Sequence, residues 1–217
     1  MSGASGRFEL YGGQGCGSAA IEALLGWAGV PYTLHDVTWE SGSASLDALR
    51  ALNPLAQVPT ARFEDGTVMT ESAAILIALA EQHPAARMLP HVGDAARRVA
   101  LRWIAFIAGN MYPAISVADF PERWISEAEG QEQLKRGARE QLQAYWRILE
   151  GALKPAPYLV GHEMTALDVY AAMVSYWQPG RKWVDANCPR VAAALALTEK
   201  QPFVQRVWKR HFAAATR

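Results

Sequence analysis

The sequence holds only two cysteines, Cys16 and Cys188, and has no excess of charge of either sign. Two cysteines cannot form the disulfide framework that small secreted domains use. A balance of 21 basic and 21 acidic residues gives no electrostatic footprint for DNA or RNA. We therefore expect neither a disulfide-stapled domain nor a nucleic-acid-binding protein.

Long apolar runs are missing as well. No run approaches the ~20 residues that a membrane span needs. The first residues, Met1 to Gly6, contain neither the basic region nor the apolar region of an export signal. These features predict a cytoplasmic protein with no membrane partner.

Two common kinds of site are not visible in the sequence. No histidine, cysteine and carboxylate residues have the spacing of a metal site, so we expect no metal. The glycine-rich segment from Gly12 to Gly17 misses the spacing of both nucleotide-binding fingerprints. A hydrophobic content of 51%, by contrast, supports compact folding around a real core.

The first 82 residues predict short strands that alternate with helices. The first strands and helices are expected, in chain order, at residues 8–11, 17–28, 32–37 and 46–52. Asp65-Gly66 between two apolar runs predicts a β-hairpin, and Glu71-Ser72 opens a further helix. The order βαβαββα predicts a mixed sheet with helices packed against it.

The composition changes after residue 83. The proline-rich and glycine-containing stretch 84–93 predicts a linker between a domain at 1–83 and a domain at 94–217. The second domain shows no convincing strand, and its apolar residues recur at helical spacing. An all-helical bundle is therefore predicted there.

Two local signals mark helix ends in this half. The apolar stripe from Val99 to Met111 is expected to stop at Tyr112-Pro113, because proline interrupts a helix. The segment from Thr165 to Asp168 fits a capping box, in which the two side chains satisfy amides of the first turn.

Several motifs together resemble the cytosolic glutathione transferases over nearly the whole chain. They are Leu10-Tyr11 before a turn and helix, Asn53-Pro54-Leu55-Ala56-Gln57-Val58-Pro59-Thr60, Thr70-Glu71-Ser72-Ala73-Ala74-Ile75 and the Thr165–Asp168 cap. The resemblance implies an N-terminal thioredoxin-like domain, a C-terminal helical domain and a homodimer. It also implies glutathione as co-substrate in detoxification.

The resemblance implies a glutathione site at Gln57, Val58, Pro59, Glu71 and Ser72. The family's proline is cis, so we expect a cis Val58–Pro59 peptide that turns the Val58 backbone toward the cysteinyl backbone of glutathione; a trans proline at the start of a strand is the alternative. Ser72 at a helix N-terminus suits the γ-glutamyl carboxylate, and Glu71 suits the ammonium. Both residues could instead serve only the helix start, and Gln57, a candidate for the glycine carboxylate, could simply be solvated.

The family lowers the pKa of the bound thiol, because the thiolate is the nucleophile. The activating group is expected between the first strand and the first helix, where Cys16, Ser18, Tyr11 and the backbone amides are candidates. Cys16 resembles the cysteine of the bacterial beta-type enzymes. At a helix start its pKa would be depressed, and it could form a mixed disulfide with glutathione; Ser18 could donate to a thiolate or cap the helix.

Two features depart from the beta type. No lysine precedes Lys135, and Tyr112 stands where the helical-domain histidine of that type would align. Tyr112, Trp103 and Phe106 are candidates for lining the electrophile pocket, although a helix stripe is often core.

We expect an enzyme that adds glutathione to, or exchanges thiols with, a small hydrophobic electrophile. A non-catalytic binding or regulatory protein of the same fold is the alternative, and a glutathione-dependent isomerase or reductase is a third possibility. A dithiol oxidoreductase is not expected, because the sequence has no Cys-x-x-Cys pair.

Overall fold

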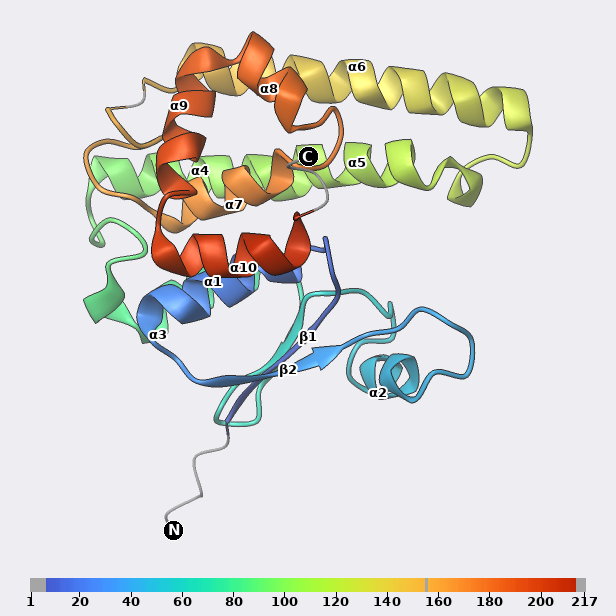
Figure 1. The fold of residues 1–217 in the computed structure, drawn as a ribbon, viewed down its shortest axis with the longest axis horizontal. Helices are drawn as coiled ribbons and strands as arrows, with labels where there is room; N and C mark the ends of the chain where they lie inside the picture. Colours follow the sequence, from blue (N-terminus) through green and yellow to red (C-terminus); the bar gives the residue numbers. More distant parts are fainter. Residues whose placement is uncertain (1–6, 155, 214–217) are drawn as a thin grey trace. The chain divides into compact units, whose positions relative to one another are not determined.

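The computed structural model describes residues 7–154 and 156–213 (Figure 1). These divide into two compact units, one formed by residues 7–88 together with 201–213 and the other by Leu89–Lys200. The sequence placed the domains at 1–83 and 94–217. The last helix, α10 (Pro202–His211), groups with the N-terminal residues because it packs along α1 (Ser18–Ala28).

The first unit has the predicted order βαβαββα, followed by α10. Its further elements are β1 (Phe8–Gly12), β2 (Tyr32–Asp36), α2 (Ala44–Leu52), β3 (Thr60–Arg62), β4 (Val68–Met69), α3 (Ser72–Gln82) and the short 3-10 helix η1 (Pro84–Ala86). The strands form one sheet in the order β2-β1-β3-β4. β2 runs parallel to β1, and β3 runs antiparallel to both of its neighbours. The predicted thioredoxin-like fold is confirmed.

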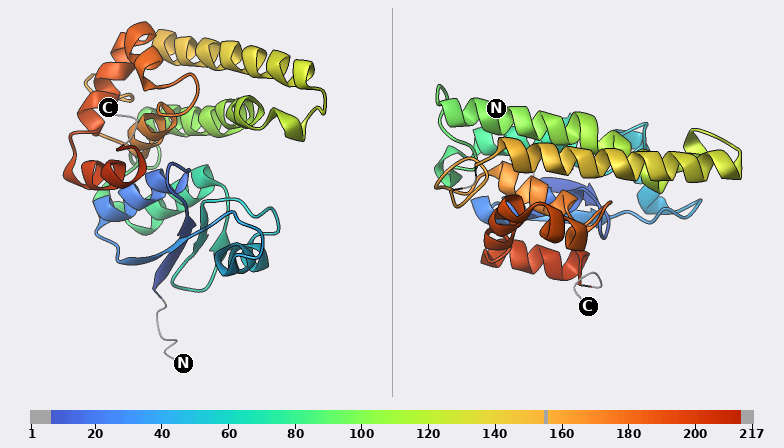
Figure 2. Two further views of the ribbon diagram at one scale, coloured as in Figure 1. Left: turned by 45° about the vertical axis from the view of Figure 1, so that its right-hand side comes forward. Right: turned by 90° about the horizontal axis from the view of Figure 1, so that it is seen from above.

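The two faces of this sheet carry different helices. Helices α1 and α3 lie together on one side and α2 lies on the other (Figure 2). Side chains alternate along β1, so the fully buried Leu10 faces opposite to Tyr11. Tyr11 packs with Val37, Leu46 and Leu49 in the cluster beneath α2. This alternation matters for the site, because it directs Tyr11 into the core.

The hairpin between β3 and β4 forms at the predicted Asp65-Gly66 pair. Gly66 has a φ of +87°, which glycine adopts without steric cost. The Thr67 amide donates to Asp65 Oδ1 at 2.8 Å, and the Phe63 amide donates to the Thr67 carbonyl at 2.9 Å. A local turn therefore fixes the register of β3 and β4.

Helices make up the second unit. They are α4 (Ala95–Phe106), the π-helix η2 (Ile107–Met111), α5 (Tyr112–Asp119), the 3-10 helix η3 (Pro121–Arg123), α6 (Ala128–Ala152), α7 (Ala166–Val174), α8 (Arg181–Asn187) and α9 (Pro189–Thr198). α6 packs along α5, and α7 packs against α4 and α9. No helix among the described residues combines the length and the apolar character needed to cross a bilayer.

The predicted helix stop at Tyr112-Pro113 is wrong. The chain continues from α4 through η2 into α5, so that Pro113 falls in the first turn of α5. Proline is tolerated in a first turn, because the amide it lacks has no partner there. The wider π-turn before it supplies the change in hydrogen-bond pattern.

The predicted capping box at the start of α7 is confirmed. The Asp168 carboxylate is fully buried and accepts hydrogen bonds from the Thr165 amide at 2.8 Å and the Thr165 hydroxyl at 2.8 Å. It also accepts from the Leu159 amide at 2.7 Å. One side chain therefore caps α7 and ties it to the chain that precedes it.

Replacing Asp168 with alanine is expected to lower the free energy of unfolding by roughly 2–4 kcal/mol, because two buried backbone amides lose their acceptor. Urea denaturation followed by circular dichroism measures this. Glu132→Gln on α6 is the control, because that side chain is 60% exposed and its loss should change stability by less than about 0.5 kcal/mol. Equal midpoints for Asp168→Ala and the wild type would contradict the assignment.

Candidate functional site

The register of the sheet brings the predicted site segments to one edge. Tyr11 near the end of β1 pairs with Thr60 at the start of β3, and Ala61 pairs with Met69 at the end of β4. The turn after β1, the loop before β3 and the start of α3 therefore meet at the same edge of the sheet.

The loop before β3 is held by a buried polar pair. Asn53 Nδ2 donates to the Gln57 carbonyl at 3.1 Å, and the Thr60 hydroxyl donates to the same oxygen at 2.9 Å. Asn53 is 4% exposed and Thr60 is fully buried, so these bonds are shielded from water. The Gln57 side chain is exposed.

The Val58–Pro59 peptide is cis, as predicted. Among the described residues, the backbone amide and carbonyl of the half-buried Val58 have no hydrogen-bond partner. Backbone groups in such surroundings normally pair. Both groups therefore remain available to a peptide-like molecule that aligns along the edge.

The start of α3 presents the second predicted segment. Ser72 is the first residue of the helix and is 6% exposed, whereas the preceding Glu71 is exposed. Glu71 has a φ of +64°, a left-handed conformation that costs a non-glycine residue on the order of 1–3 kcal/mol. The amides at this helix start carry partial positive charge and suit an anion.

The turn after β1 spans Gly13 to Cys16. The Cys16 amide donates to the Gly13 carbonyl at 3.2 Å, and Gly15 takes the left-handed φ of +73°. The half-buried Cys16 thiol donates to the Gln14 carbonyl at 3.7 Å. Burial raises the pKa of this thiol, so the expected depression of its pKa is wrong.

Two other candidates for thiol activation have structural partners. Ser18 is fully buried; its hydroxyl accepts from the Gly13 amide at 3.3 Å and donates to the Gly13 carbonyl at 3.4 Å. The Tyr11 ring stacks on His35 at 4.5 Å on the α2 side of the sheet. A side chain on Gly12 would collide with Ser18, since its Cβ would lie 2.5 Å from the hydroxyl oxygen.

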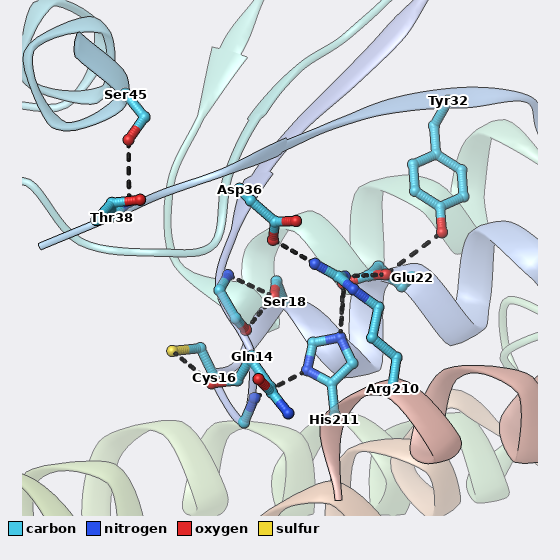
Figure 3. Close-up of polar contacts among 12 residues, drawn as sticks. Gln14, Cys16, Ser18, Glu22, Tyr32, Asp36, Thr38, Ser45, Arg210 and His211 are labelled. Carbon is cyan, nitrogen blue, oxygen red and sulfur yellow. Dashed lines mark hydrogen bonds and ion pairs between the residues drawn. The ribbon is translucent and has the colours of Figure 1, made fainter. Parts of the chain in front are cut away.

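Sequence reasoning missed a buried polar cluster beside this turn, shown in Figure 3. Glu22 of α1 is 3% exposed and accepts hydrogen bonds from Arg210 and from His211 Nε2 of α10. His211 Nδ1 in turn accepts from the Gly15 amide at 3.1 Å. A single acidic residue in an otherwise apolar helix was the available signal, because a buried carboxylate needs partners.

The aromatic candidates for an electrophile pocket all make contacts within the second unit. The ring of Trp103 packs edge-on against Phe106 at 5.1 Å, and Tyr112 stacks on Tyr170 at 5.6 Å. Their role in substrate binding stays a prediction. Among the described residues, no group of three or more histidine, cysteine or carboxylate side chains is arranged to hold a metal ion.

Because the pKa of Cys16 is raised above 9.0, we expect less than ~1% thiolate at pH 7. Alkylation of the protein by iodoacetamide should therefore accelerate about tenfold per pH unit between pH 7 and pH 8.5. Mass spectrometry of the modified peptide measures the rate.

A Cys16→Ser variant supplies the background for this experiment, because Cys188 is fully buried and burial raises its pKa to about 11. A rate that is already constant between pH 6 and pH 7 would show a low-pKa thiol and contradict the prediction.

Comparison with known proteins agrees with this architecture. Residues 18–82 match the family model of the glutathione S-transferase N-terminal domain. The chain is 35% identical to the uncharacterized GST-like protein YncG of Escherichia coli (strain K12), over 94% of this chain and 98% of that protein. It is 27% identical to glutathione S-transferase GstA of Escherichia coli O157:H7, over 91% of this chain and 95% of that protein.

A solved structure shares the fold. The crystal structure of a glutathione transferase homologue from Sulfitobacter, with bound glutathione, superposes with a TM-score of 0.80 at 23% identity, over 93% of this chain and 96% of that chain. Together with the identity to YncG over almost the full length of both proteins, these findings show that the chain belongs to the glutathione S-transferase family.

Proposed function

We propose that the protein is a glutathione transferase, which activates the thiol of glutathione for addition to a small hydrophobic electrophile. The observation that carries the proposal is the open backbone of Val58 at the edge where α3 begins. Glutathione is a peptide with an anionic γ-glutamyl end, so it needs both a backbone partner and an anion site. The glutathione bound to the Sulfitobacter homologue supports this choice of ligand.

Each predicted ligand residue has a proposed role. Val58 pairs with the cysteinyl backbone through its amide and carbonyl, beside the cis Pro59. Ser72 and the start of α3 hold the γ-glutamyl carboxylate, and the exposed Glu71 accepts from the ammonium. Gln57, whose carbonyl is fixed and whose side chain is exposed, reaches the glycine carboxylate.

Cys16 is the proposed catalytic side chain, with Ser18 shaping the turn. Because burial raises the pKa of Cys16, its thiol is protonated at neutral pH and can exchange its weak hydrogen bond to the Gln14 carbonyl for one to the thiolate of glutathione. A protonated thiol is a poor nucleophile. This favours conjugation over the thiol exchange that a Cys16 thiolate would carry out.

A second candidate is a glutathione-binding protein without turnover. The observation in its favour is that the Ser18 hydroxyl is engaged by Gly13 and that Tyr11 lies in the core, which leaves the weak Cys16 donor and the backbone amides to act on a thiolate. A homodimer, as the family resemblance implies, and a cytoplasmic location belong to either proposal.

Calorimetric titration with reduced glutathione at pH 7.5 is expected to show about one site per subunit. Each chain has one sheet edge at which the Val58 backbone and the start of α3 meet. Ser72→Ala should weaken binding at least about tenfold by removing a charge-assisted hydrogen bond. Ser126→Ala, an exposed serine of the helical unit, is the matched control and should bind normally. No binding at millimolar glutathione would refute both candidate functions.

Turnover of an activated aryl chloride with glutathione separates the two candidates. We expect conjugation by the wild type and a loss of roughly tenfold or more in kcat for Cys16→Ala, with glutathione binding unchanged, because the donor acts on the thiolate. Full turnover by Cys16→Ala would remove Cys16 from the mechanism. Glutathione binding without any turnover by the wild type would favour the non-catalytic protein.

A further inference from the structure

The polar cluster of Glu22, Arg210 and His211 has no place in the proposed chemistry, yet it reaches the turn that carries Cys16 (Figure 3). The side chain of His211 is completely buried and that of Glu22 is 3% exposed. Neither can contact a substrate. Any influence on the site must therefore act through the turn itself.

The hydrogen bond from the Gly15 amide defines the tautomer of His211. A backbone amide only donates, so the 3.1 Å bond from the Gly15 amide requires an unprotonated Nδ1. The ring proton then lies on Nε2, which donates to Glu22 Oε1 at 2.9 Å. The ring thus connects a carboxylate on one side with a peptide group on the other.

The side-chain oxygens of Glu22 have several hydrogen-bond donors besides His211. Arg210 Nη1 lies 3.1 and 2.9 Å from its two oxygens. The Tyr32 hydroxyl donates at 3.5 Å, and burial together with Glu22 raises the pKa of Tyr32 to about 12, which keeps the donor protonated. Arg210 also bonds Asp36 at the end of β2. The carboxylate that orients His211 is therefore fixed by donors from two other elements, β2 and α10.

The Gly15 amide belongs to the central peptide of the Gly13–Cys16 turn. The carbonyl of that same peptide is the Gln14 oxygen that accepts from the Cys16 thiol at 3.7 Å. Since the peptide is planar and trans, its amide and carbonyl point in opposite directions. The two common turn types differ by rotation of this peptide, and the φ of +73° at Gly15 marks one of them.

We propose that His211 is a positioning residue, which locks the Gln14–Gly15 peptide in the orientation that aims its carbonyl at the Cys16 sulfur. A carbonyl acceptor stabilises the protonated thiol and opposes the thiolate. Without the lock the peptide can rotate, and the Gly15 amide can turn toward the sulfur and stabilise a thiolate. The inference takes this turn as part of the proposed glutathione site, but its readouts need no glutathione, so either proposal can fail alone.

Two substitutions separate the acceptor role of Nδ1 from the donor role of Nε2. His211→Asn places a carboxamide oxygen near Nδ1 and keeps an acceptor for Gly15, whereas it ends short of Glu22. His211→Gln places a carboxamide nitrogen near Nε2 and keeps the donor to Glu22, whereas the acceptor near Gly15 is lost. Lys209→Gln, at an exposed neighbouring position on α10, controls for a general effect of changing this helix.

The rate of Cys16 alkylation by iodoacetamide is measured for all four proteins at pH 8. We expect His211→Gln to react roughly three- to tenfold faster than the wild type, and His211→Asn and Lys209→Gln to react at about the wild-type rate. Equal or slower alkylation of His211→Gln would overturn the proposal. Equal acceleration in both His211 variants would also overturn it, because the link to Glu22 would then be the cause.

Nuclear magnetic resonance of the wild type tests the hydrogen bond between the Gly15 amide and His211 without a substitution. We expect the ring of His211 in the Nε2–H form and slow hydrogen exchange at the Gly15 amide. A protonated Nδ1 at neutral pH, or free exchange at Gly15, would overturn the proposal even if the His211 variants failed to fold.

Discussion

The first unit depends on the burial of one carboxylate. Glu22 lies in the apolar helix α1 with 3% of its surface exposed, and an unpaired charge in that position would strongly destabilise the fold. Its partners are Arg210 and His211, 188 and 189 residues further along the chain. This requirement ties α10 to α1 and explains why the last helix belongs with the N-terminal sheet. The same arginine reaches Asp36 at the end of β2, so the charge on one helix organises two other elements around the turn after β1.

Peptide groups, more than side chains, form the candidate site. Asn53 and Thr60 both hold the Gln57 carbonyl, and Ser18 holds both polar groups of Gly13. The supporting side chains are buried, which strengthens these bonds and excludes water from them. A site of this kind depends on the buried side chains that hold the backbone groups in place and on the geometry of the turn.

Local signals in the sequence predicted the elements, and distant contacts decided the rest. Asp65-Gly66 and the Thr165–Asp168 box carry their own geometry, so the hairpin and the cap could be placed without tertiary information. The cis Val58–Pro59 peptide followed from a motif. Helix α8, only seven residues long and rich in polar residues, has no apolar stripe to reveal it. The partners of Glu22 could not be predicted either, because no periodicity relates residues so far apart in the chain.

The error over the Cys16 pKa shows why position along a chain is insufficient for predicting reactivity. A cysteine before a helix was expected to face the amides of the first turn, which favour a thiolate. In the structure the backbone carbonyl of Cys16, and not its thiol, faces the first turn, because this carbonyl accepts a hydrogen bond from the Ala19 amide at 3.1 Å. The thiol faces the Gln14 carbonyl instead and is half-buried. Burial and the carbonyl both favour the neutral form. The orientation of one peptide therefore decides which charge state the surroundings stabilise, and α10 contacts that peptide through His211.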